Sequence, residues 1–191
     1  MTVEPNAAAL EMFRQAEAAL RAGRPDLAFG HLQQACAIDP AAAAPRLLRG
    51  RLLAQGGRLS EALADFEIAA RGGDDAEAWH LLGLTLGRLG RRREAIAPLR
   101  RARELAPGHL RTLELLAQAE FEAGDPADAL PLWRELQALR PDDEDTLLRL
   151  GETLSRVGRD DEARALFAGA SARKPGSPAL CMALAQAEEI A

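Results

Sequence analysis

Residues 78–107 decide the fold and read AWHLLGLTLGRLGRRREAIAPLRRARELAP. Apolar residues recur at helical spacing from Trp79 to Leu86, and the run stops at Gly90, which can adopt the left-handed conformation that closes a helix. A second helix is predicted over 92–105, and Pro107 ends it because proline cannot continue the hydrogen-bond ladder. The stretch therefore predicts two antiparallel helices joined by a short turn.

This pattern recurs through the chain with a fixed period. An alanine in each second helix and a glycine in each turn return every 33 or 34 residues. The alanines are Ala28, Ala62, Ala95, Ala129 and Ala163, and the glycines are Gly23, Gly57, Gly90, Gly124 and Gly158. Such a period is typical of a solenoid, in which each unit buries its apolar face against its neighbours. The predicted fold class is all-α, an α-solenoid of antiparallel helix pairs.

Composition excludes a disordered chain and argues against a nucleic-acid binder. Of the 191 residues, 48% are hydrophobic and 28% are charged, which excludes disorder, and tyrosine is absent. The net charge of −5 argues against a nucleic-acid binder, which needs a surface that neutralises phosphates. Lys174 is the only lysine among 24 basic residues, a bias that hints at a GC-rich bacterial genome.

The phased positions resemble the tetratricopeptide repeat family. A small residue lies near the middle of each first helix, a bulky residue follows in each second helix, and a proline closes most repeats. These are Ala16, Gly50, Gly83, Ala117 and Gly151; then Leu32, Phe66, Leu99, Trp133 and Phe167; then Pro40, Pro107, Pro141 and Pro175. Arg49 departs from the family pattern, which has leucine there.

The resemblance implies a right-handed superhelix of five repeats and one further helix. The expected divisions are a lead-in (1–8), repeats at 9–42, 43–75, 76–109, 110–143 and 144–177, and a capping helix or half repeat (178–191).

Catalytic and metal-binding patterns are absent from the sequence. The three histidines fall in different repeats, and no HExxH or paired-cysteine spacing occurs. Cys36 and Cys181 fall on expected apolar helix faces, where each is predicted to be a small buried side chain. No cofactor, metal or catalytic residue is predicted.

The predicted binding surface is the concave face, which in the resembled family is lined by the first helices. The residues that this implies are Phe13, Leu47, Arg51, His80, Leu84, Arg88, Arg111, Glu114, Gln118, Phe121, Leu148, Glu152 and Arg156, with Glu17 beside them. Leu47, Leu84, Phe121 and Leu148 are expected to be exposed, as a strip on which a peptide or helix docks. The alternative for each is packing at the seam between helices.

We expect a non-enzymatic protein–protein interaction scaffold or adaptor, with an unidentified protein as partner, no nucleic acid and no membrane. One alternative is an interaction module of a larger bacterial enzyme, such as a sulfotransferase, a glycosyltransferase or an aspartyl-hydroxylase-like protein. Another is a self-assembling scaffold, a homo-oligomer. The arginines between Arg88 and Arg103 are expected to be a solvated face, with a docking patch for an acidic partner as the rival interpretation.

The segment 1–6 lacks basic residues followed by an apolar run, and no membrane-spanning stretch occurs. A cytoplasmic location is therefore expected.

Overall fold

The computed structural model describes residues 6–189, and all regular secondary structure within them is helical. The chain divides into two compact units, residues 1–107 and 108–191. Unit 1 contains α1 (Ala7–Arg21), α2 (Pro25–Ile38), α3 (Ala43–Gln55), α4 (Leu59–Arg71), α5 (Ala76–Arg88) and α6 (Arg92–Leu105). Unit 2 contains α7 (Leu110–Ala123), α8 (Pro126–Leu139), α9 (Glu144–Arg156), α10 (Asp160–Arg173) and α11 (Pro178–Glu189).

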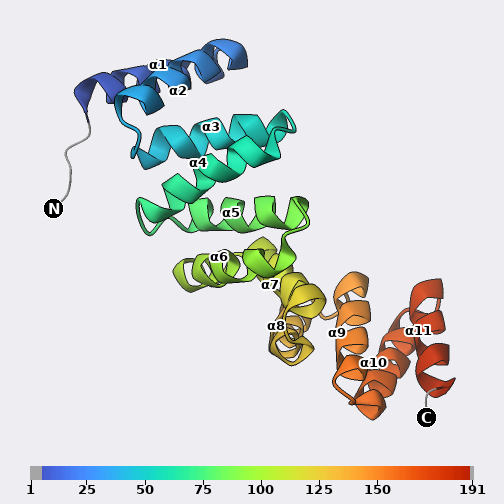
Figure 1. The fold of residues 1–191 in the computed structure, drawn as a ribbon. Coiled ribbons are helices and arrows are strands. Elements are labelled where there is room, and N and C mark those ends of the chain that lie inside the picture. The colour runs from blue at the N-terminus through green and yellow to red at the C-terminus, as the bar shows by residue number, and fades with distance from the viewer. Residues whose placement is uncertain (1–5, 190–191) are drawn as a thin grey trace. The chain divides into compact units, whose positions relative to one another are not determined.

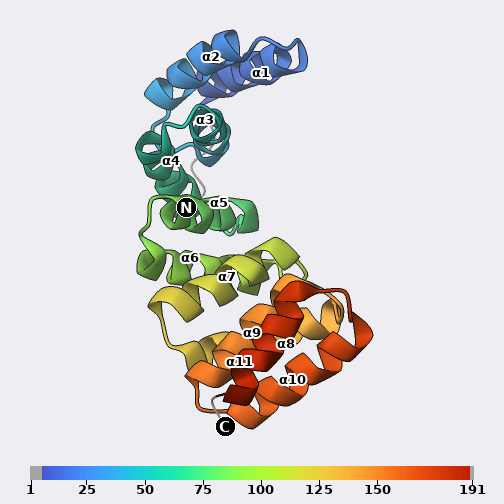
Figure 2. The ribbon, with the colours of Figure 1, turned by 90° about the vertical axis from the view of Figure 1, so that its right-hand side faces the viewer.

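Within each unit every helix packs against the next one in the sequence. In unit 1 the pairs α1/α2, α3/α4 and α5/α6 lie in successive layers (Figure 1). In unit 2, α9, α10 and α11 pack together, and α11 also contacts α9 (Figure 2). The predicted all-α fold of stacked antiparallel helix pairs is confirmed, as is the predicted helix over 92–105.

Left-handed glycines make the turns inside the helix pairs. Gly90 has a φ of 77°, and the N–H of Arg91 bonds back to Leu86 O at 2.9 Å. This arrangement satisfies carbonyls at the end of α5. The turn between α7 and α8 differs, because Gly124 has a φ of −102° and Asp125 caps α8 by accepting the N–H of Ala127 at 2.9 Å. The predicted Asp125–Pro126 helix start is confirmed.

Small residues of the first helices allow close contact with bulky residues of the second helices. A Cβ built at Gly50 would lie 2.7 Å from Phe66, and one at Gly83 would lie 2.5 Å from Leu99. Phe66 and Leu99 are almost fully buried. The small and bulky positions of the period therefore form the contact between the helices of a pair.

A buried ionic cluster joins α3 to α4 in unit 1. The Asp65 carboxylate is 1% exposed, and it accepts two hydrogen bonds from Arg49 at 2.7 Å each and one from Arg46 at 2.9 Å. Arg49, which departs from the family's leucine, is thus matched by an acidic residue on the facing helix. A buried carboxylate needs such partners, because desolvation of an unpaired charge is costly.

Candidate protein-interaction faces

The predicted binding residues of unit 1 lie on the first helices of its pairs. We call this set the unit 1 face: Phe13 on α1, Leu47 and Arg51 on α3, and His80, Leu84 and Arg88 on α5. The two arginines are exposed and the four other side chains are half-buried. An ion pair between Arg51 and Glu77 links α3 to α5 along this face.

Part of each apolar side chain of the unit 1 face is used for packing. Phe13 packs against a buried cluster that includes Ala16 and Leu32. Leu47 and Leu84 are half-buried rather than fully exposed. Part of each side chain is therefore packed between helices, and part of it is exposed. The remaining exposed part is apolar area that a partner can cover.

The predicted residues of unit 2 lie on α7 and α9, and we call them the unit 2 face: Arg111, Glu114, Gln118, Phe121, Leu148, Glu152 and Arg156. Glu114 accepts hydrogen bonds from Arg111, at 3.0 Å, and from Arg140. These two bonds lower the pKa of the Glu114 carboxyl below its ordinary value, against a burial effect that acts in the opposite direction. Gln118 bonds to Glu122, and Glu152 pairs with Arg149 at 3.3 Å.

The prediction that Phe121 is exposed is wrong. Its side chain is 3% exposed, and the Arg156 guanidinium lies over the ring, with its carbon 4.0 Å from the ring centroid. At the positions one period away the chain has small residues, Gly87 and Ser155, so the period gave no sign that a large ring at this point would be covered by Arg156. Phe121 is therefore a buried residue of the unit 2 face, and the Arg156 guanidinium packs against its ring.

Met182 on α11 was missed by the sequence analysis. It lies 34 residues after Leu148 and is 62% exposed. The period itself was the signal, because extending the series Leu47, His80, Glu114, Leu148 by one more repeat reaches this residue. Met182 adds an adaptable apolar side chain to the unit 2 face.

The two cysteines differ from each other. Cys36 is buried, as predicted, and burial raises the pKa of its thiol. The prediction for Cys181 is wrong, since this residue is exposed on α11, where only Leu180 and Ala187 are buried. In this structure α11 packs against α10 and α9, and Cys181 does not lie on the side that faces them.

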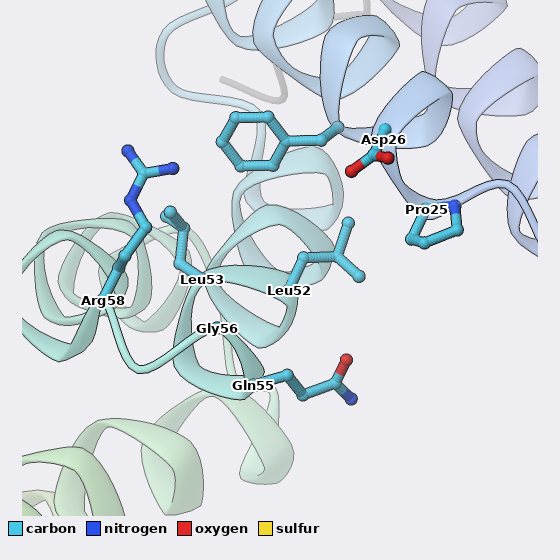
Figure 3. A pocket seen from close by; sticks show the side chains of 8 residues that line it. Pro25, Asp26, Leu52, Leu53, Gln55, Gly56 and Arg58 are labelled. Atoms are coloured by element: carbon cyan, nitrogen blue, oxygen red, sulfur yellow. The ribbon is translucent and has the colours of Figure 1, made fainter.

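A cleft of about 480 Å³ opens at one edge of unit 1 (Figure 3). Its lining residues are Pro25, Asp26 and Phe29 of α2, Leu52, Leu53 and Gln55 of α3, and Gly56 and Arg58 of the following turn. The Arg58 guanidinium lies 5.5 Å from the centroid of Phe29 and is held by Glu61 through two hydrogen bonds of 2.7 and 2.6 Å. The cleft is thus lined by apolar side chains together with Asp26, Gln55 and Arg58, and Arg58 is paired with Glu61. Arg58 follows the turn glycine Gly57 as Arg91 follows Gly90, but the sequence analysis drew no cleft from this repetition.

Two arginines of the stretch 88–103 are paired with acids. Arg91 donates two hydrogen bonds to Glu94, at 2.7 and 2.6 Å, and Arg101 pairs with Asp74 at 2.5 Å and Glu104 at 2.9 Å. Exposed pairs of this kind contribute little to stability, about 0–1 kcal/mol each. Their geometry agrees with a solvated, charge-balanced surface.

Residues 6–189 offer neither a metal site nor a membrane span. None of the His, Cys, Asp and Glu side chains in that range form a group of three or more that could hold a metal ion. Nor does any helix in it have the length and apolar character of a membrane span.

Comparison with known proteins places the fold in one family. Models described as Tetratricopeptide repeat match residues 47–109, 80–144 and 120–187. Cellulose synthase 2 operon protein C of Komagataeibacter xylinus is 36% identical over 114 residues, which are 58% of this chain and 9% of that protein. The chain therefore spans a small part of the length of this relative.

Two solved structures show the same fold. One is YrrB, a TPR protein with an unusual peptide-binding site, with a TM-score of 0.80 and 20% identity over 92% of this chain and 91% of YrrB. Another is MamA from Desulfovibrio magneticus RS-1, with a TM-score of 0.69 and 18% identity over 91% of this chain and 99% of that one. Together with the matches along residues 47–187, the helix pairs and their glycine turns show that the chain belongs to the tetratricopeptide repeat family.

Proposed function

We propose that this chain is a non-catalytic interaction scaffold that binds a segment of a partner protein on the exposed faces of its first helices. The observation that carries the proposal is made in each unit separately: two incompletely buried apolar side chains lie at one phase of the repeat, Phe13 and Leu47 in unit 1 and Leu148 and Met182 in unit 2. The same phase holds His80 and Glu114 in the repeats between them, and charged side chains such as Arg51 and Glu152 follow one turn later. Apolar contacts with a polar rim are the usual composition of a peptide-docking surface.

Membership in a family of protein-binding repeats supports this function, as does the fold shared with YrrB, which has a peptide-binding site. A micromolar affinity, about −8 kcal/mol, is expected, because ordering a flexible segment offsets part of the contact energy. We place the interaction in the cytoplasm, and the partner's identity is open.

A second candidate is that the chain is the interaction module of a larger bacterial protein. The match to 9% of the length of cellulose synthase 2 operon protein C favours it. In that case the same faces would recruit a partner to the activity of the longer protein. The two candidates share one binding mechanism and differ in what the binding serves.

The decisive experiment compares face variants with surface variants of the same chemistry. Leu47→Glu changes the unit 1 face and Leu148→Glu the unit 2 face, whereas Leu27→Glu and Leu139→Glu place the same charge on second helices, where the leucines are 41% and 57% exposed. All four proteins are checked for helicity by circular dichroism. Proteins from a lysate of the source organism are then captured on each and identified.

A partner retained by wild type and by both surface variants, but lost by a face variant, supports the proposal, and its overlapping peptides locate the bound segment. A partner retained by every folded variant contradicts binding on the faces. Light scattering of the same samples tests self-assembly: a monomer over a wide concentration range removes that alternative.

A further inference from the structure

We propose that Arg156 is a pre-positioned carboxylate-binding group of the unit 2 face, and that the segment bound there carries an acidic side chain about four residues from an apolar one that packs on Leu148. This inference rests on the proposed function and adds the chemistry of the partner. The partner class is an extended internal peptide segment with an apolar residue and an Asp or Glu at that spacing.

Two contacts fix the Arg156 side chain before any partner arrives. Its guanidinium lies 4.0 Å from the centroid of the Phe121 ring, and its Nη1 donates a hydrogen bond of 3.0 Å to Phe121 O. Phe121 is buried, so the packing around it holds its ring in place. A long side chain normally loses rotamer freedom when it binds, and this loss has already occurred for Arg156.

Within residues 6–189, the described part of the chain, Arg156 contacts a carbonyl and an aromatic ring and no acidic side chain. The neighbouring acids of the face are engaged elsewhere, since Glu152 pairs with Arg149 and Glu122 accepts a bond from Gln118. Of the five N–H donors of a guanidinium, one is used by Phe121 O. The remaining planar donors suit a carboxylate.

The spacing of the two partner residues follows from α9. Leu148 and Arg156 lie eight positions apart on this helix, so their backbone positions are about 12 Å apart along the helix axis at 1.5 Å per residue. An extended peptide advances about 3.3 Å per residue, so about four residues cover this distance. An even number also places both side chains on the same side of the extended segment, facing α9.

The structure offers a competing role for Arg156, as a basic residue in the last turn of α9 that offsets the helix dipole. That role predicts a loss of helix stability when Arg156 is changed, and no dependence on the charge of a bound peptide. The experiment therefore measures peptide charge preference together with stability.

The test is selection of random dodecapeptides displayed on phage. The library is selected separately on wild type, on Arg156→Gln and on Arg134→Gln, a control that removes an exposed arginine of α8 paired with Glu162. Leu148→Glu serves as a fourth target that removes the apolar contact. Circular dichroism and urea unfolding verify that each target is folded.

We expect peptides from wild type and from Arg134→Gln to share an apolar residue and an Asp or Glu four positions away. In direct titration of one such peptide, replacing its acid by the amide weakens binding to wild type about tenfold and leaves binding to Arg156→Gln unchanged. Arg156→Lys retains the charge without the planar fork, so it falls between these two results.

The outcomes separate the two proposals. Peptides that depend on Leu148 but show no acidic preference, or the same preference on Arg156→Gln, overturn this inference alone. Absence of any peptide that depends on Leu148 overturns the inference and also peptide binding on the unit 2 face. Acidic residues enriched at spacings other than four refute the extended arrangement along α9 and with it the inference as stated.

Discussion

Gly83 is the position where one methyl group tests the packing of unit 1. A Cβ added there would lie 2.5 Å from Leu99 Cγ and 2.7 Å from its Cδ2, whereas carbon atoms in contact are normally about 3.5–4.0 Å apart. Leu99 is 1% exposed, and Cγ is the branch point of its side chain. Rotation of the methyl groups cannot relieve the contact, so α5 and α6 must separate.

Two effects of opposite sign set the magnitude for Gly83→Ala. Replacing glycine by alanine inside a helix stabilises by about 1 kcal/mol, because the unfolded chain has less freedom to lose. Overpacking a buried contact costs about 1–3 kcal/mol, and a contact short by about 1 Å belongs near the upper end. The expected net change is a loss of about 2 kcal/mol of unfolding free energy.

The assay uses the distribution of the two tryptophans. Trp79 is in unit 1 and Trp133 in unit 2, so a Trp133→Phe background leaves fluorescence that reports on unit 1. Urea unfolding of Gly83→Ala is compared with Gly87→Ala, a change in the same helix where an added Cβ meets nothing within 4 Å. Gly87→Ala should raise the midpoint, with a gain of at most about 1 kcal/mol.

Equal stabilisation by the two changes would refute the close contact. A second comparison tests its cause, because Leu99→Ala removes the atoms that the new methyl group meets. In a Leu99→Ala background Gly83→Ala should become stabilising, although Leu99→Ala itself costs about 2–5 kcal/mol. If Gly83→Ala lowers the unfolding free energy in both backgrounds, its cost does not arise from the contact with Leu99.

Three further predictions concern charges and thiols. Asp65→Asn removes the buried acid that pairs with two half-buried arginines, Arg46 and Arg49, and should cost about 3 kcal/mol in urea unfolding of unit 1, with no shift in the transition of unit 2. Asp143 has a pKa below its ordinary value, chiefly because the Thr146 side chain bonds to its carboxylate; its stabilisation is therefore complete above the unfolded pKa of about 4 and is lost as pH falls through the folded value. Asp143→Ala should cost about 1 kcal/mol at pH 7, and the difference from wild type should shrink below pH 4. A thiol reagent should label exposed Cys181 rapidly and buried Cys36 only as the chain unfolds, which mass spectrometry of labelled peptides measures.

The fold could be predicted because the same short-range constraints recur in successive repeats of the sequence. A left-handed glycine such as Gly90 ends a helix for local reasons, and the small residue opposite a bulky one, as at Gly83 and Leu99, specifies which helix packs beside it. Because successive repeats show the same pattern independently, the period predicts the fold even though every helix is short.

The candidate site could be predicted only as a set of positions. Burial of Phe121 depends on Arg156, which lies 35 residues later and approaches from the next helix pair. Arg49 was an anomaly in the sequence because its partner, Asp65, belongs to the facing helix and follows no repeated pattern. A contact between two unrepeated residues cannot be inferred from the period, and the cleft beside Phe29 and Arg58 was missed although Arg58 follows its turn glycine as Arg91 and Arg159 do.

Residues that pack the helices and residues that stay exposed differ in how much they vary from repeat to repeat. Positions that pack the helices hold the same kind of residue in each repeat, as the buried alanines Ala62 and Ala95 show. Positions on the exposed phase change from repeat to repeat while their backbone setting stays the same, so local structure does not dictate their chemistry. The buried Phe121 and the exposed Arg156 are two residues that the other repeats do not share, and the ring of the first lies under the cation of the second. Side chains can therefore vary at such positions without a change of the fold, which is the property that the proposed binding by unit 2 requires.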